Sequence, residues 1–151
     1  MNSTLFDSPV GTLFIAESDG RICEISYCSG KKETVRESRL LIEARMQLTE
    51  YFSGKRREFD LPLLEEGSDF ALAVRREMLA IPYGTTKTYS EIAAEIGNPK
   101  AARAVGMACH NNPLAIVVPC HRVIGVGVNL VGYAGGFEKK EFLLRLERAV
   151  F

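Results

Sequence analysis

Helix start and stop signals follow one another so closely between residues 88 and 112 that only short helices fit there. Thr88 and Glu91 have the spacing of a capping box, which predicts a helix that starts here and ends at Gly97. Asn98 then serves as the N-cap of a second helix, with a proline at its first position. Two short helices joined by one tight turn predict a helix-turn-helix.

The first thirty residues follow a different pattern, in which apolar and polar residues alternate loosely around the turn sequences SPVG and SDG. This pattern predicts a β-hairpin. Helices are predicted over residues 38–52, from about residue 70, and over 138–147, and LAIVVP at residues 114–119 predicts a buried strand. We therefore expect an α/β protein, with a small α/β domain at residues 1–66 and a mostly helical domain at residues 67–151.

Charge is divided unevenly along the chain. The net charge is zero, but residues 1–69 contain nine Lys and Arg against thirteen Asp and Glu, and residues 70–151 contain ten against six. An anionic partner is therefore expected to bind the second half. A chance imbalance is the alternative interpretation.

The chain has four cysteines, Cys23, Cys28, Cys109 and Cys120. Their spacing is not that of a disulfide framework. No secretory signal is recognised, and no apolar segment approaches the roughly 20 residues that cross a bilayer. We therefore expect free thiols in a cytoplasmic or otherwise intracellular protein that is not secreted and has no membrane partner. Both histidines lie far from the first two cysteines, so we expect no metal site.

Residues 116–125, IVVPCHRVIG, place a thiol, an imidazole and a guanidinium side by side after an apolar segment. The thiolate is the reactive form of cysteine, and we expect the charges of His121 and Arg122 to favour it at Cys120. Neighbouring side chains on a strand point to opposite sides, so His121 assists Cys120 only if the chain bends or a water bridges them. A remote carboxylate would then orient the imidazole, and Glu147 is a candidate. The alternative is an inert buried thiol.

The second helix of the predicted pair, PKAARAVGMAC, consists mainly of small residues, with Arg103 as the long side chain in its middle. A helix that reads the major groove usually carries several Arg, Asn or Gln side chains. Small residues instead allow the backbone to approach a narrow groove closely, while one side chain enters the base stack. The alternative is that these small residues serve tight helix packing.

Two segments, GNPKAARAVG at residues 97–106 and NNPLAIVVPCHRVIG at residues 111–125, resemble the O6-alkylguanine-DNA alkyltransferases, also called methylated-DNA–protein-cysteine methyltransferases. The resemblance is dense from about Phe70 to Glu147 and looser before it, and PCHRV in this setting is a highly specific motif. It implies a ribonuclease-H-like N-terminal α/β domain. It also implies a winged-helix-like C-terminal domain that binds DNA through the minor groove and flips the damaged guanine.

The resemblance implies roles in the chemistry for five residues. Cys120 matches the alkyl acceptor, His121 the residue that deprotonates it through a water, and Glu147 the carboxylate that holds this histidine. Asn112 matches the asparagine that braces the turn before the active-site segment. Tyr89 matches the tyrosine that crowds the target phosphate and offers a proton to the guanine leaving group.

The resemblance also implies the DNA contacts and the guanine pocket. Arg103 matches the finger that enters the duplex in place of the flipped base. The other residues implied to contact DNA are Tyr89, Ser90, Asn98 and Ala102, and those implied to form the guanine pocket are Val123, Tyr133, Ala134 and Gly135. Some members have serine at the position of Ala134, where alanine keeps the backbone N–H but lacks the hydroxyl.

What the resemblance implies as a whole is repair of double-stranded DNA that contains O6-alkylguanine, with O4-alkylthymine left open as a further substrate. The alkyl group moves to Cys120 of the protein itself. Because a thioether has no good leaving group, each molecule acts once. No metal or organic cofactor is required, and we expect the free protein to be monomeric.

Two other classes of function fit parts of the sequence. One is a DNA-binding protein without transfer activity, such as a regulator or a protein that only marks damage. A regulator is expected to have more base-reading side chains than PKAARAVG offers, and the damage-marking relatives replace the acceptor cysteine, which this chain keeps as Cys120. The other class is a Cys-His-Glu hydrolase, which needs an oxyanion hole that the sequence does not identify.

Overall fold

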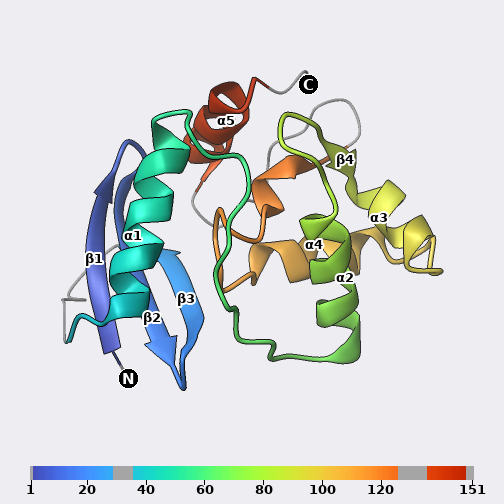
Figure 1. Cartoon of the computed structure of the whole chain (residues 1–151). Coiled ribbons are helices and arrows are strands. Elements are labelled where there is room, and N and C mark those ends of the chain that lie inside the picture. The colour runs from blue at the N-terminus through green and yellow to red at the C-terminus, as the bar shows by residue number, and fades with distance from the viewer. Residues whose placement is uncertain (1, 29–35, 126–135, 149–151) are drawn as a thin grey trace. The chain divides into compact units, whose positions relative to one another are not determined.

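The computed structural model describes residues 2–28, 36–125 and 136–148 (Figure 1). The chain forms two compact units, the first with residues 1–64 and 113–117 and the second with residues 65–112 and 118–151. The second unit is therefore not one continuous stretch of sequence. As the sequence predicts, the fold is mixed α/β, with a sheet in the first unit and mostly helices in the second.

An antiparallel sheet in the order β1-β2-β3 forms the first unit together with one helix. Its strands are β1 (Asn2–Ser8), β2 (Gly11–Ser18) and β3 (Arg21–Tyr27). Asp19 and Gly20 connect β2 with β3, and both have positive φ angles, of 53° and 77°. Such a two-residue turn matches the right-handed twist of a hairpin. The predicted β-hairpin is confirmed, and the sheet contains one strand more.

Helix α1 (Arg39–Phe52) covers one face of this sheet (Figure 1). Ser38 caps it, because its hydroxyl oxygen accepts a hydrogen bond from the backbone N–H of Leu41. The apolar side chains at the centre of this unit have no solvent exposure; they include Leu13, Ile15, Ile22, Ile25, Leu41, Leu48 and Tyr51. Burial of both the helix face and the sheet face holds this unit together.

Residues 113–117 join the first unit without forming a strand. The N–H of Ile25 donates to the carbonyl oxygen of Pro113 at 2.8 Å, and the N–H of Ala115 donates to that of Ile25 at 3.0 Å. These bonds form one isolated bridge, and Ile116 has a φ angle of 72°, so the chain turns there. The predicted strand at LAIVVP is therefore wrong. The segment is apolar because it is buried, and burial does not require extended backbone.

The second unit consists mainly of helices: α2 (Asp69–Leu79), α3 (Tyr89–Glu95), α4 (Ala102–His110) and α5 (Phe137–Leu146) (Figure 1). Two short strands, β4 (Lys87–Thr88) and β5 (Val123–Ile124), pair in parallel. The predicted capping box of Thr88 and Glu91 is present at the start of α3. None of the helices in the described part of the chain is both long and apolar enough to cross a membrane.

Helix α4 begins at Ala102, so the prediction that Asn98 caps it is wrong. Gly97 has a φ of 83°, its N–H donates to the carbonyl of Ala94, and the N–H of Asn98 donates to that of Ala93. This is a Schellman motif, in which Asn98 completes the end of α3 instead of opening α4.

Candidate active site

Cys120 opens a 3-10 turn, Cys120–Arg122, that follows Pro119. Successive side chains on such a turn point about 120° apart, unlike those on a strand. The chain therefore bends at Cys120, which meets one of the two conditions under which His121 can assist the thiol. Both side chains are buried, with 4% of Cys120 and none of His121 exposed to solvent.

Asn112, which follows α4, braces this turn. Its Nδ2 atom donates hydrogen bonds to the carbonyl oxygen of Val118 at 2.9 Å and to Cys120 Sγ at 3.2 Å. Burial raises the pKa of the Cys120 thiol, whereas the Asn112 hydrogen bond and the charge of Lys140 lower it. The pKa of the thiol is raised overall, because the Asn112 hydrogen bond and the Lys140 charge offset only part of the effect of burial.

We expect Asn112→Ala to raise the pKa of Cys120, because the thiolate loses a hydrogen-bond donor. The measurement is the rate of alkylation of Cys120 by iodoacetamide against pH, followed by peptide mass spectrometry. The midpoint of this curve of alkylation rate against pH should move to higher pH in Asn112→Ala. Asn111→Ala, which changes an exposed neighbour, serves as the control. An identical midpoint in the two variants would contradict the role given to the Asn112 amide.

His121 and Arg122 both bind the carboxylate of Glu147, the C-cap residue that follows α5. His121 Nε2 donates to Glu147 Oε2 at 2.7 Å. Arg122 binds the same carboxylate through two hydrogen bonds, from Nε to Oε1 at 2.8 Å and from Nη2 to Oε2 at 3.0 Å. Arg122 Nη1 also donates to the carbonyl oxygen of Ile81 at 2.8 Å. The structure thus brings together two residues 26 positions apart, His121 and Glu147, that the sequence analysis pairs as base and orienting carboxylate.

The electrostatics of this triplet leave a neutral imidazole beside an ionised carboxylate. Burial lowers the pKa of His121. Burial alone would raise the pKa of Glu147, but the hydrogen bonds and charges of His121 and Arg122 lower it to about 2. Because His121 Nε2 carries the proton that Glu147 accepts, Nδ1 is the basic nitrogen, and it has no hydrogen-bond partner among the described residues.

The hypothesis that Arg122 favours the thiolate of Cys120 is not supported. Its guanidinium is bound to Glu147, and the cation whose charge lowers the pKa of Cys120 is Lys140. Sequence reasoning missed Lys140, although a signal was present. Lys140 lies three and four residues before the buried Leu143 and Leu144, which places it on the inner face of α5.

Tyr89 is brought to the site by the pairing of β4 with β5. Lys87 pairs with Val123 and Thr88 with Ile124, so the first residue of α3 follows a strand that lies beside the segment after Cys120. Tyr89 is half-buried; burial, followed by the charges of Cys109 and Cys120, raises its pKa to about 12. The buried Val123 carbonyl accepts a hydrogen bond from Lys140.

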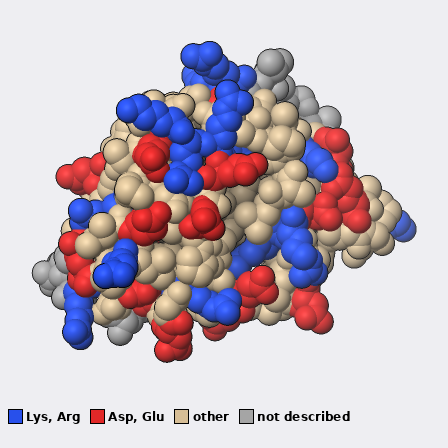
Figure 2. Space-filling model, viewed as in Figure 1, with Lys and Arg blue, Asp and Glu red and all other residues tan. Residues whose placement is uncertain are grey.

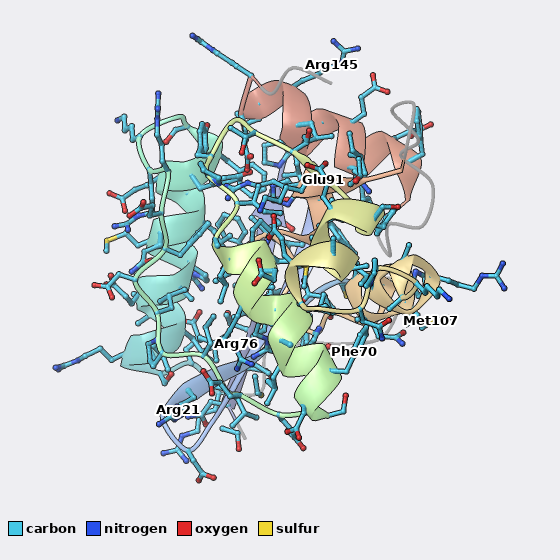
Figure 3. All side chains as sticks on the ribbon, turned by 90° about the vertical axis from the view of Figure 1, so that its right-hand side faces the viewer. Arg21, Phe70, Arg76, Glu91, Met107 and Arg145 are labelled. Carbon is cyan, nitrogen blue, oxygen red and sulfur yellow. The ribbon has the colours of Figure 1, made fainter. Side chains whose placement is uncertain are left out.

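The residues implied to contact DNA lie on α3, on α4 and in the turn between them. Ser90, Asn98 and Arg103 are exposed, and Ala102 is half-buried. Met107, one turn after Arg103 on α4, is 59% exposed and was not predicted to contact a partner (Figure 3). Basic and acidic side chains are interspersed on the face shown in Figure 2.

Part of the predicted guanine pocket, namely Tyr133, Ala134 and Gly135, lies outside the described residues. Within residues 2–28, 36–125 and 136–148, no group of three or more His, Cys, Asp or Glu side chains could hold a metal ion. All four cysteines are free thiols.

Both parts of this chain match known domain families. Residues 1–64 match the ribonuclease-like domain of 6-O-methylguanine DNA methyltransferase, and residues 69–149 match its DNA binding domain. The chain is 45% identical over 153 residues to the methylated-DNA–protein-cysteine methyltransferase of Methanosarcina acetivorans, covering 97% of this chain and 98% of that protein. It is 46% identical to the constitutive methylated-DNA–protein-cysteine methyltransferase of Bacillus subtilis, covering 96% and 94%.

Solved structures agree with the sequence relatives. The crystal structure of Mycobacterium tuberculosis OGT in complex with DNA superimposes with a TM-score of 0.91 at 42% identity, covering 98% of this chain and 93% of that one. The M. tuberculosis O6-methylguanine methyltransferase superimposes with a TM-score of 0.89 at 41% identity, covering 97% and 92%. This chain belongs to the 6-O-methylguanine DNA methyltransferase family, and its function is DNA repair by transfer of an alkyl group to a cysteine.

Proposed function

We propose that this protein takes a methyl or other small alkyl group from O6-alkylguanine in double-stranded DNA and transfers it, once, to Cys120. The observation that carries the proposal is the arrangement around Cys120. A buried thiol, held by Asn112, stands next to a neutral His121 whose Nδ1 is basic and whose other nitrogen is held by Glu147. These are the parts of an activated nucleophile.

In the proposed reaction, the Cys120 proton passes through a water to His121 Nδ1, and the thiolate attacks the alkyl carbon in line. The S–C bond forms as the C–O6 bond breaks, and the electron pair of that bond remains with the guanine. Tyr89 offers a proton to the leaving guanine. Asn112 and Glu147 act by positioning Cys120 and His121, respectively. Because the thioether is stable, no second turnover follows.

DNA binding is proposed for residues 67–151, with α3 and α4 as the helix-turn-helix. Flipping a base out of the duplex costs a few kcal/mol, and an inserted side chain offsets part of that cost. Arg103 is exposed in the middle of α4 and is proposed to enter the stack. The further proposed contacts are those of Tyr89, Ser90, Asn98 and Ala102, and the proposed guanine pocket consists of Val123, Tyr133, Ala134 and Gly135. We also propose that the free protein is monomeric and works inside the cell, where the DNA is.

Intact-protein mass spectrometry after incubation with a duplex that contains O6-methylguanine tests this function. We expect one added methyl group per protein, located on the peptide that contains Cys120, and never more than one. A protein that binds the lesion tightly but stays unmodified would overturn the proposal in favour of lesion recognition without repair.

We expect Arg103→Ala to slow repair of duplex DNA by about 10-fold or more, because the flipped base loses its replacement in the stack. Transfer from free O6-methylguanine base should change far less, since no base is flipped. Single-turnover rates with the two substrates provide the measurement. Arg21→Ala, which removes an exposed arginine of β3 in the first unit, is the matched control (Figure 3). Equal losses with duplex and free base would contradict the proposed insertion.

A further inference from the structure

Met107 of α4 is a large apolar side chain on the surface proposed to bind DNA. It is 59% exposed, more than any other large apolar side chain in the described part of the chain (Figure 3). Within α3 and α4, which the structure describes in full, no second large apolar side chain is exposed. Single exposed apolar residues are common on proteins, so what sets Met107 apart is its position on the helix.

Helical geometry places Met107 at the centre of the outward face of α4. Val105 and Cys109 are the buried residues of this helix. Each lies two positions from Met107, so its side chain points about 160° away around the helix axis. Arg103 precedes Met107 by four positions, so these two side chains lie about 40° apart around the axis and about 6 Å apart along it. Arg103 and Met107 are therefore neighbours on one exposed surface.

The helix backbone beside Met107 lies against the candidate active site. A Cβ atom at Gly106 would lie 3.8 Å from Cδ1 of Tyr89, so α4 passes close to that ring. Met107 follows Gly106 and leaves the helix next to this contact. A duplex whose flipped guanine reaches the site past Tyr89, and whose base stack receives Arg103, therefore also covers Met107.

The chemistry of methionine suits a wedge in the minor groove. Apolar side chains, Met among them, insert between base steps there and partly unstack them. The Met side chain is unbranched, flexible and without a strong hydrogen-bonding group, so it fills an irregular gap without reading base identity. Contact with DNA also removes its exposed apolar surface from water. Its neighbours Ala104 and Gly106 are small, so the helix backbone can approach the groove closely enough for this insertion.

We propose that Met107 is a second inserted side chain: as Arg103 enters the base stack at the lesion, Met107 wedges open the minor groove about two base-pair steps away. The spacing follows from the separation of about 6 Å along α4 and the rise of about 3.4 Å per base pair. This inference rests on the proposed function and adds a contact that keeps the duplex distorted beside the flipped guanine. The contact offsets part of the cost of flipping.

Met107→Ala removes the wedge and keeps a strong helix former in α4. We expect it to weaken binding to an O6-methylguanine duplex by about 10-fold, because the apolar surface of Met107 is no longer buried against DNA. Repair of the duplex at low protein concentration should slow accordingly, whereas transfer from free O6-methylguanine base should change far less. Gel-shift titration gives the affinity, and single-turnover kinetics give the rates.

Two further variants serve as comparisons. Met107→Leu keeps an apolar side chain of similar volume, so its affinity should stay within about twofold of that of the unsubstituted protein. Met46→Ala is the matched control, because it makes the same exchange at a methionine of α1 that is 48% exposed. It should change neither affinity nor rate.

A fluorescent base separates a wedge from a contact on the groove surface. 2-Aminopurine is bright when unstacked, and it is placed at successive positions on each side of the lesion, in each strand in turn. We expect unstacking on one side only, about two steps from the lesion, because Met107 follows Arg103 toward the C-terminal end of α4. Met107→Ala should lose this signal, and Met107→Leu should keep it. All proteins in this measurement carry Cys120→Ala, so that the lesion is not removed.

Oxidation by dilute hydrogen peroxide tests the position of Met107 without any change to α4. Peroxide converts exposed methionines to sulfoxides, which peptide mass spectrometry detects. In the free protein, Met107 and Met46 should both react, while Met78, which is 2% exposed, should react slowly. A saturating O6-methylguanine duplex should protect Met107 and leave Met46 unchanged. The protein again carries Cys120→Ala.

The outcomes distinguish this inference from the proposed function. If an O6-methylguanine duplex does not methylate Cys120 of the unsubstituted protein, the proposed function fails. If Cys120 is methylated but Met107 is oxidised equally fast with and without DNA, Met107 is not at the interface and the inference is wrong. An unstacking signal that is absent from both sides, or that persists in Met107→Ala, would overturn the wedge. Equal rates of duplex repair in Met107→Ala and Met46→Ala would do the same.

Discussion

Cys120→Ala is expected to abolish methyl transfer completely while leaving binding to lesion-containing duplex largely intact. The substitution removes the atom proposed to accept the alkyl group, and the small side chain is buried, so the surface of α3 and α4 is unchanged. The next thiol in the unit, Cys109, does not replace it. Burial raises the pKa of Cys109 to about 12, and its sulfur lies 3.7 Å from that of Met78.

The measurement combines intact-protein mass spectrometry with a gel-shift titration of the same duplex. Cys28→Ala, which removes a half-buried thiol of the first unit, should retain full transfer. Removal of the methyl group from DNA by Cys120→Ala would show that the acceptor is assigned to the wrong residue. A methyl group on the Cys109 peptide would identify the acceptor instead.

The second large effect is expected for Glu147→Gln, which removes the charge that both His121 and Arg122 bind. Breaking a buried ion pair from one side costs about 3–5 kcal/mol, because the remaining charge stays buried without its partner. We expect the free energy of unfolding at pH 7 to fall by this amount and methyl transfer to slow, since the imidazole loses its orientation. Urea denaturation and single-turnover rates measure the two effects.

Glu141→Gln on the same helix is the matched control for Glu147→Gln. Glu141 forms an ion pair with Arg145, whose side chain is 70% exposed, so the loss should be at most about 1 kcal/mol. Equal losses in the two variants would show that the buried triplet does not contribute to stability beyond a surface pair.

The same triplet predicts that stability falls in acid. The pKa of Glu147 is lowered from 4.5 to about 2, so its contribution is fully present above pH 4.5 and disappears as pH falls toward 2. This difference corresponds to roughly 3 kcal/mol. The lowered pKa of His121 acts in the same direction below pH 6.5, because the unfolded chain then binds a proton more readily. Glu147→Gln should lose less stability than the unsubstituted protein between pH 4.5 and 2.

Local signals in the sequence predicted the elements whose ends are determined by nearby residues. Thr88 accepts the capping hydrogen bond expected of it, and Asp19 with Gly20 forms the hairpin turn. These interactions join residues a few positions apart, so their chemistry is visible in a short stretch of sequence. The Cys-His-Arg sequence at residues 120–122 was visible in the same way.

Elements whose conformation depends on distant partners were predicted less well. Residues 114–119 are as apolar as a buried strand. In the structure, however, the chain turns at Ile116 and forms one isolated bridge to Ile25. Asn98 has the chemistry of an N-cap, yet its N–H completes the end of α3. The sequence indicated correctly that residues 114–119 are buried and that Asn98 is a polar residue at a helix end. The backbone conformation of both was decided by backbone hydrogen bonds that the sequence alone does not reveal.

The sequence by itself determined the order of the sheet and the helices. It also determined the position of the proposed acceptor thiol, Cys120, and of the imidazole next to it. Only the tertiary structure decided which charges meet around that thiol. It pairs Arg122 with Glu147 across 25 positions and places Lys140 beside Tyr89 across 51. The physical reason is that the energy of a buried charge depends on partners brought close by folding, and sequence distance does not limit which partners these are.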